Sequence, residues 1–193
     1  MQPSDIELPL LESRAYLHGT TLFDAMMRHV PEGAAVSFKI SKRIDSDCVR
    51  LQSVEASTKV SASLAWTGGA ESGALVAIEL SHSGRARRER YDEAWVEQRA
   101  LVQGKRAVLR DAPPYGLVQA LIPLFKALLK KQAVTTTPGQ WMFTRLDLSA
   151  QPRVFLPLEL ALAGTVPNQL ARAKVRCAGT ELGMLYFSWV PRS

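Results

Sequence analysis

The sequence predicts an α+β protein built from two copies of one unit, each with a strand, a long helix and then four strands. Two observations lead to this prediction: a short motif that occurs twice, and the same order of helical and extended segments around both occurrences. A third is composition, because 47% of the 193 residues are hydrophobic and 22% are charged, an ordinary balance for a folded globular protein. A chain of this length can form one large core or two small ones.

The repeated motif is the skeleton Gly-x-Glu-x-Gly-x-Leu. It occurs in GAESGALVAIEL, residues 69–80, and again in GTELGMLYFSWV, residues 179–190. A strand-like run precedes each motif, over 59–66 and 169–177, and an apolar strand-like run follows it. Each motif therefore predicts a β-hairpin with a glycine-containing turn.

Two further strands are predicted ahead of each hairpin. They cover residues 34–44 and 48–54 in the first half, and 141–148 and 153–162 in the second. Alternation of apolar and polar residues is typical of strands with one buried face. The sequence thus predicts an antiparallel sheet in each half.

One helix is predicted before the four strands of each half. The first, from about Thr20 to Val30, has an apolar stripe at helical spacing, formed by Leu22, Phe23, Met26, Met27 and Val30. The second, from about Leu117 to Lys131, is apolar on nearly all sides, which indicates a helix surrounded by other structure. Pro123 inside it predicts a kink or a later start.

The repeat defines the expected domain organisation. We expect a first unit over 1–82, a charged connection over 83–104 with a short helix near 91–102, and a second unit over 105–193. A short extended segment leads each unit to a glycine at the start of its helix, Gly19 and Gly116.

Charge and residue usage narrow the classes of function. The net charge of +6 favours an anionic partner. The sequence has no zinc-finger, RNP or P-loop pattern, so charge alone is a poor argument for nucleic acid. Two cysteines and three histidines lack the spacing of metal ligands, and we expect no metal and no cofactor. The sequence shows neither a signal-peptide pattern nor an 18-residue apolar run, which predicts a cytoplasmic protein without membrane attachment.

The element order, with the pair His18-Gly19 at the start of the first helix, resembles the hotdog fold, in which an antiparallel sheet wraps a long helix. The repeat makes the chain similar to a double hotdog. This resemblance implies a thioester-linked acyl substrate carried by coenzyme A or an acyl carrier protein. It also implies a thioesterase or hydroxyacyl dehydratase activity. The alternative is a non-catalytic double hotdog that binds an acyl group or a protein as an accessory module, and either form could be a homo-oligomer.

The start of the first helix is the candidate site. Backbone N–H groups of Gly19 and Thr20 at a helix N-terminus can stabilise the oxyanion formed when a thioester carbonyl is attacked. His18 is placed to move a proton, and Asp24 is the only acid in this helix. Structural alternatives remain open, because Thr20 can cap the helix and Asp24 can pair with Arg28.

The sequence departs from the patterns of the resembling families at several positions. Thioesterases of this fold commonly have a second glycine where this chain has Thr20, and a carboxylate where it has Met27. The His-Phe-Pro-Gly loop of the dehydratases is missing. In the second copy Tyr115 precedes Gly116, and its helix contains no acid. We therefore expect at most the first copy to have a catalytic site.

The run RARRER, residues 85–90, is the candidate contact for the phosphates of coenzyme A or for an acidic carrier protein. Its arginines Arg85, Arg87 and Arg88 have the fork geometry that suits phosphate groups. The alternative is a solvated, charged linker.

Overall fold

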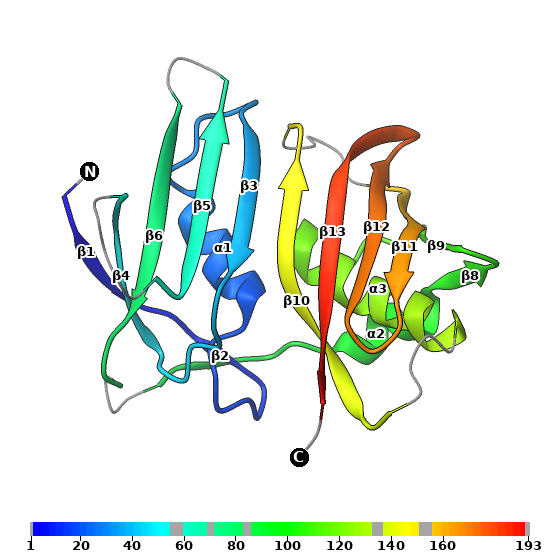
Figure 1. Ribbon diagram of the computed structural model, residues 1–193, viewed down its shortest axis with the longest axis horizontal. Helices are drawn as coiled ribbons and strands as arrows, with labels where there is room; N and C mark the ends of the chain where they lie inside the picture. Colours follow the sequence, from blue (N-terminus) through cyan, green and yellow to red (C-terminus); the bar gives the residue numbers. More distant parts are fainter. Residues whose placement is uncertain are drawn as a thin grey trace. The chain divides into compact units, whose positions relative to one another are not determined.

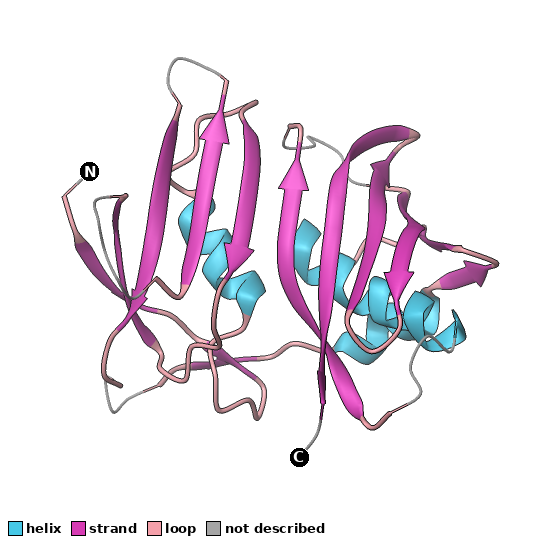
Figure 2. Ribbon diagram, in the orientation of Figure 1, coloured by secondary structure: helices cyan, strands magenta, loops and turns pink. Residues whose placement is uncertain are grey.

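A computed structural model of the chain describes residues 2–54, 60–68, 72–82, 86–132, 137–150 and 156–191. The chain divides into two units, Met1–Tyr91 and Asp92–Ser193. The division falls inside the segment for which the sequence predicts a connection. Each unit has a helix against one face of an antiparallel sheet, as Figure 2 shows for α1 and α3.

The first unit has the predicted order of a strand, a helix and four strands (Figure 1). Its elements are β1 (Ser4–Glu7), β2 (Leu10–Leu11), α1 (Gly19–Met27), β3 (Ala35–Ile40), β4 (Cys48–Ser53), β5 (Ala62–Thr67), β6 (Gly73–Glu79) and β7 (Arg88–Glu89). The sheet of this unit has the strand order β1-β4-β6-β5-β3, and its neighbouring strands are antiparallel. The short strands β2 and β7 form a separate parallel pair.

Helix α1 buries the apolar stripe that the sequence predicts. Leu22, Phe23 and Met26 are buried, and the ring of Phe23 packs edge-on against Phe38 of β3, with ring centroids 5.4 Å apart. The helix ends at Met27, three residues before the predicted end. Pro31 explains the difference, because a proline disfavours helical geometry in the residue before it, here Val30.

The second unit also has a strand, a long helix and four strands, with an additional helix and strand before them. Its elements are α2 (Glu93–Arg99), β8 (Leu101–Gln103), β9 (Arg106–Leu109), α3 (Leu117–Gln132), β10 (Gly139–Leu148), β11 (Leu158–Val166), β12 (Leu170–Cys177) and β13 (Thr180–Pro191). Its sheet has the strand order β10-β13-β12-β11-β9-β8.

Helix α3 is the core of the second unit. It is buried on nearly all sides, as predicted, and the ring of Phe125 lies against that of Phe187 of β13 at 4.9 Å. The helix begins at Leu117 and continues through the buried Pro123, so the expectation of a later start is wrong. Helix α2 packs on α3, where Lys126 donates a 2.6 Å hydrogen bond to Glu93. Residues of the predicted connection therefore form part of this unit.

The two sheets differ in the position of the repeated hairpin. Both predicted hairpins are present, as the antiparallel pairs β5–β6 and β12–β13. In the first unit, however, the earlier strand of the hairpin, β5, pairs with β3, the strand that follows the helix. In the second unit the later strand, β13, pairs with the corresponding strand β10. The two hairpins match in sequence, but the strand that lies next to the first strand after the helix is the earlier one in the first unit and the later one in the second. Residues 69–71 of the first motif lie outside the described residues.

Candidate functional site

The start of α1 brings His18, Gly19 and Thr20 together. His18 is the residue before the helix, with an extended backbone at φ −75° and ψ 138°, and its carbonyl accepts a 3.2 Å hydrogen bond from the Leu22 N–H. Its side chain does not cap the helix. Instead the ring atom Nδ1 lies 2.8 Å from Oγ1 of Thr20.

The backbone N–H of Gly19 is the most distinctive group of this site. The first N–H groups of a helix have no acceptor within the helix, and they form a partial positive charge. Among the described residues, the structure pairs no acceptor with the Gly19 N–H. In the second unit, by contrast, the N–H of Gly116 donates to Oε1 of Gln119 at 3.2 Å. A ligand carbonyl could accept from the Gly19 N–H, which belongs to the first residue of α1, whereas Gly116 directly precedes α3.

His18 is enclosed by aromatic rings. Only 7% of its surface is exposed, and Thr20 is fully buried. The ring centroid of Tyr91 lies 5.6 Å from that of His18, and that of Tyr16 lies 6.5 Å from it. When Nδ1 carries the proton and donates it to Thr20, Nε2 has a lone pair, which is the form that a general base needs.

Asp24, the predicted acid of α1, is exposed to solvent on the helix. Desolvation by the surrounding protein raises the pKa of its carboxyl to about 6, and the positive charge of Arg28 opposes this rise. The carboxyl can therefore gain or lose a proton close to neutral pH, as an acid or base in catalysis must.

The described arginines of the run, Arg87, Arg88 and Arg90, are exposed, and two of them have partners within the protein. Arg85 lies outside the described residues. Arg87 forms an ion pair with Glu89 at the surface. Arg88 donates through Nη1 to the backbone carbonyl oxygens of Glu12, at 2.6 Å, and Arg14, at 3.2 Å. The side chain of Arg88 thus holds the loop that leads to His18.

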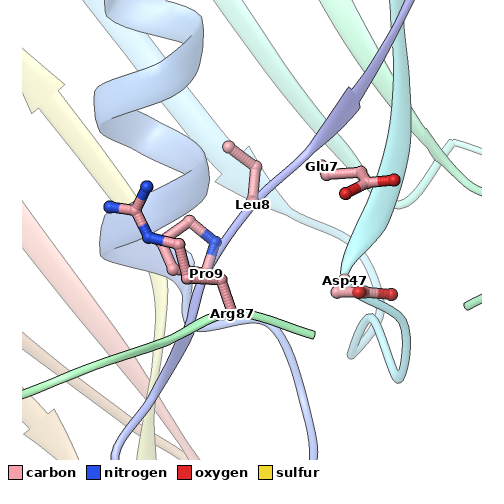
Figure 3. A pocket seen from close by; sticks show the side chains of 5 residues that line it. All are labelled: Glu7, Leu8, Pro9, Asp47 and Arg87. Atoms are coloured by element: carbon pink, nitrogen blue, oxygen red, sulfur yellow. The ribbon is translucent and has the colours of Figure 1, made fainter. Parts of the chain in front are cut away.

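A small pocket of about 180 Å³ lies in the first unit and is distinct from the start of α1 (Figure 3). It is lined by Glu7, Leu8, Pro9, Asp47 and Arg87. The carboxylates of Glu7 and Asp47 lie on one side of the view, opposite Arg87. Two carboxylates beside one guanidinium make this pocket a poor place for a phosphate.

Two groups at the site are not predicted by any local pattern in the sequence. Tyr91 is 3% exposed and contacts His18, although it is far from it in the chain. Glu12 has a left-handed backbone with φ 52° and accepts the Tyr91 N–H at 2.6 Å. A left-handed backbone at a residue other than glycine is uncommon. The sequence contains only one hint, which is that Tyr91 directly follows the arginine run.

The structure offers no metal site or membrane-spanning helix in the part of the chain that it describes. No group of three or more histidine, cysteine, aspartate or glutamate side chains in this part could hold a metal ion. None of its helices is both long and apolar enough to cross a bilayer.

Comparison with solved structures identifies the fold. The dehydratase domain of PpsC from Mycobacterium tuberculosis, solved in complex with C12:1-CoA, aligns with 97% of this chain and 93% of its own length, at a TM-score of 0.52 and 10% identity. A protein described as a fusion DH domain aligns with 92% of this chain and 80% of its own, at a TM-score of 0.50 and 12% identity. The chain has a double hotdog fold.

Other structural neighbours of this double hotdog chain are named as thioesterases in their descriptions. A protein designated thioesterase II from Thermobifida fusca YX aligns with 98% of this chain and 91% of its own, at a TM-score of 0.49 and 10% identity. No family model matches the sequence, and no curated protein matches it significantly. At these identities the comparisons show the fold, while the chemistry has to be argued from the residues of this chain.

Proposed function

We propose that this protein binds and acts on an acyl thioester, carried by coenzyme A or an acyl carrier protein, at the start of α1. The observation that carries the proposal is the N–H of Gly19, which points from a helix N-terminus, has no acceptor among the described residues and adjoins His18. Such a group stabilises negative charge on a carbonyl oxygen as a nucleophile attacks the carbonyl carbon.

The chemistry assigns a role to each residue of the site. In a hydrolysis, the oxygen of water bonds to the thioester carbon while Nε2 of His18 takes a proton from that water. The Gly19 N–H donates to the resulting oxyanion, and Thr20 keeps the imidazole oriented through Nδ1. The carbon–sulfur bond then breaks, and the thiolate leaves and takes up a proton. In a dehydration, the same Nε2 would remove a proton from the carbon next to the carbonyl, a carbon–carbon double bond would form, and the hydroxyl on the following carbon would leave as water by taking up that proton from the imidazolium.

Two further observations support an acyl thioester as the ligand. The similar dehydratase domain of PpsC was solved in complex with C12:1-CoA. The net charge of +6 suits a ligand with phosphate groups.

The burial of His18 favours a second candidate, a non-catalytic module that binds an acyl group or a protein. Its ring is 7% exposed, and the ring of Tyr91 lies against it. In such a module the Gly19 N–H would hold a carbonyl oxygen without any later step. This candidate predicts binding without turnover.

The experiment compares thiol release from acyl-CoA esters of increasing chain length, and enoyl product from 3-hydroxyacyl-CoA esters, in three proteins. These are the wild type, His18→Ala and the control His29→Ala, which changes an exposed histidine just beyond the same helix. We expect His18→Ala to lower kcat by about 10²- to 10⁴-fold, the usual contribution of a general base, and His29→Ala to leave it unchanged.

The possible outcomes separate the candidates. Equal rates in the wild type and His18→Ala would remove His18 from the chemistry. A rise in melting temperature with an acyl-CoA, without turnover of any ester, would favour the binding module. If no ester is turned over and no acyl-CoA raises the melting temperature, both candidate functions are rejected.

A further inference from the structure

Residues 86–91, which we name the clasp, run alongside the segment that leads from β2 to His18. Strands β2 and β7 pair in parallel, Leu10 with Arg88 and Leu11 with Glu89. The Leu10 N–H donates to the carbonyl of Arg87 at 2.9 Å. The clasp therefore begins its contact with this segment several residues before the start of α1.

Glu12 is the centre of the contact. Its N–H donates to the carbonyl of Glu89 at 2.9 Å, its own carbonyl accepts from Arg88, and its carboxylate accepts the N–H of Tyr91. All three partners belong to the clasp. The left-handed backbone of Glu12, which an isolated chain would disfavour, is thus held by three separate hydrogen bonds.

Arg88 and Tyr91 extend this hold to the catalytic candidate. A single guanidinium nitrogen of Arg88, Nη1, donates to two carbonyls of the loop, those of Glu12 and Arg14, and so ties the two ends of the loop's turn together. The buried ring of Tyr91 contacts both Arg14 and His18. The guanidinium of Arg14 is 5.6 Å from its centroid, and the His18 ring is at the same distance.

We propose that the clasp positions and shields the imidazole of His18, with Arg88 and Tyr91 as positioning residues. The importance of the clasp for catalysis rests on the function proposed above, whereas its effect on the His18 ring does not. Arg88 thereby acts on the site through the protein backbone rather than by binding substrate phosphates.

The test measures modification of each histidine in the full chain by diethylpyrocarbonate, which acylates accessible neutral imidazoles, with mass spectrometry to resolve the sites. The chain has three histidines. His29 is exposed and the side chain of His82 is 56% exposed, so both serve as internal references for the buried His18. We expect His18 to react far more slowly than the references in the wild type.

Substitutions in the clasp should change this rate selectively. We expect Arg88→Ala and Tyr91→Leu to raise the rate at His18 by about tenfold, because a short two-residue strand pair opens readily once its side-chain contacts are lost. Arg87→Ala is the matched control, since it removes the neighbouring arginine, which pairs with Glu89 instead of the loop.

Three results would overturn the proposal. These are a wild-type rate at His18 equal to that of the references, an unchanged rate in both Arg88→Ala and Tyr91→Leu, and an equal rise in Arg87→Ala. If Arg88→Ala does not fold, Arg88→Lys keeps the charge but lacks the Nη1 that donates to both carbonyls, and it should raise the rate to a smaller extent. The modification assay uses no acyl-CoA, so the reactivity of His18 tests the clasp even if the proposed function is wrong.

If the protein does turn over thioesters, Arg88→Ala should lower kcat more than it changes KM.

Discussion

Gly19 and Gly116 lie at the starts of α1 and α3, and they differ in whether a side chain accepts their backbone N–H. Gly19 is the first residue of α1, whereas Gly116 directly precedes α3, which begins at Leu117. Three residues after Gly116 stands Gln119, whose side-chain oxygen accepts the Gly116 N–H. Three residues after Gly19 stands Leu22, which is buried in the core and has no acceptor in its side chain. Among the described residues the structure pairs no acceptor with the N–H of Gly19, whereas the N–H of Gly116 donates to Gln119.

The pH dependence of stability should reveal the environment of Asp24. Its pKa is raised to about 6 from an ordinary value of 3.8, so the folded state favours the protonated form. The stability that this group contributes is present below about pH 4 and is lost as pH rises through 6. We expect Asp24→Asn to gain melting temperature relative to the wild type between pH 4 and pH 7.5, modestly because the side chain is exposed. A difference that is constant with pH would contradict the raised pKa.

At the scale of elements, the helices follow local sequence while the strand order does not. The apolar stripe of α1 and the apolar surroundings of α3 are encoded by spacing along the chain, and both helices lie close to their predicted ranges. The order of strands in a sheet depends instead on hydrogen-bonded pairing between segments that lie far apart in the sequence. The hairpins β5–β6 and β12–β13 have similar sequences, yet β5 and β13 occupy the corresponding position in their sheets.

The repeated glycine of β13 gives a test of sheet packing. A Cβ at Gly183 would lie 1.9 Å from the carbonyl oxygen of Asp147 on β10, where neither backbone can easily move. We expect Gly183→Ala to lower the free energy of unfolding by about 2–4 kcal/mol, measured by urea denaturation.

Gly164→Ala on β11 is the matched control for this prediction. The nearest atom to its new Cβ is Nε of Arg172 at 3.1 Å, which belongs to a flexible side chain that can move aside. We expect a loss of less than about 1 kcal/mol. Equal losses in the two variants would show that close approach to the β10 backbone is not the cause.

For the whole molecule, the two units have the same kind of fold but differ in the polar groups at the start of the long helix. The first has an unpaired Gly19 N–H beside a buried histidine, within the described residues. The second has a capped Gly116 N–H and a tyrosine, Tyr115, whose hydroxyl oxygen accepts the N–H of Asp92. The repeat is therefore a repeat of scaffold, and we propose that only the first unit binds a thioester carbonyl.

This asymmetry predicts a stoichiometry. Titration calorimetry with a thioether analogue of an acyl-CoA, which cannot be hydrolysed, should give one site per chain. His18→Ala should weaken that site, whereas Tyr115→Phe in the second unit should not change it. Two sites of equal affinity would contradict the asymmetry, because they would require the Gly116 N–H to exchange its Gln119 acceptor for the ligand.

Local periodicity in the sequence was sufficient to predict two helices, two hairpins and the order of elements, because helices and strands reflect spacings of two to four residues. It also placed His18 and Gly19 at the start of a helix, since a helix start has a short-range pattern. Assigning the arginines to phosphates, in contrast, had to rely on residue type alone.

The contacts of these residues depended on the folded chain. Arg88 reaches Glu12 across 76 positions, and Tyr91 reaches it across 79, so no window of sequence contains either contact. The exchange of hairpin positions between the two sheets has the same origin, because pairing between strands is a choice among distant segments. The spacing of residues along the chain determined where the helices and strands form. Contacts between residues far apart in the sequence decided how the strands pair and which side chains lie around His18.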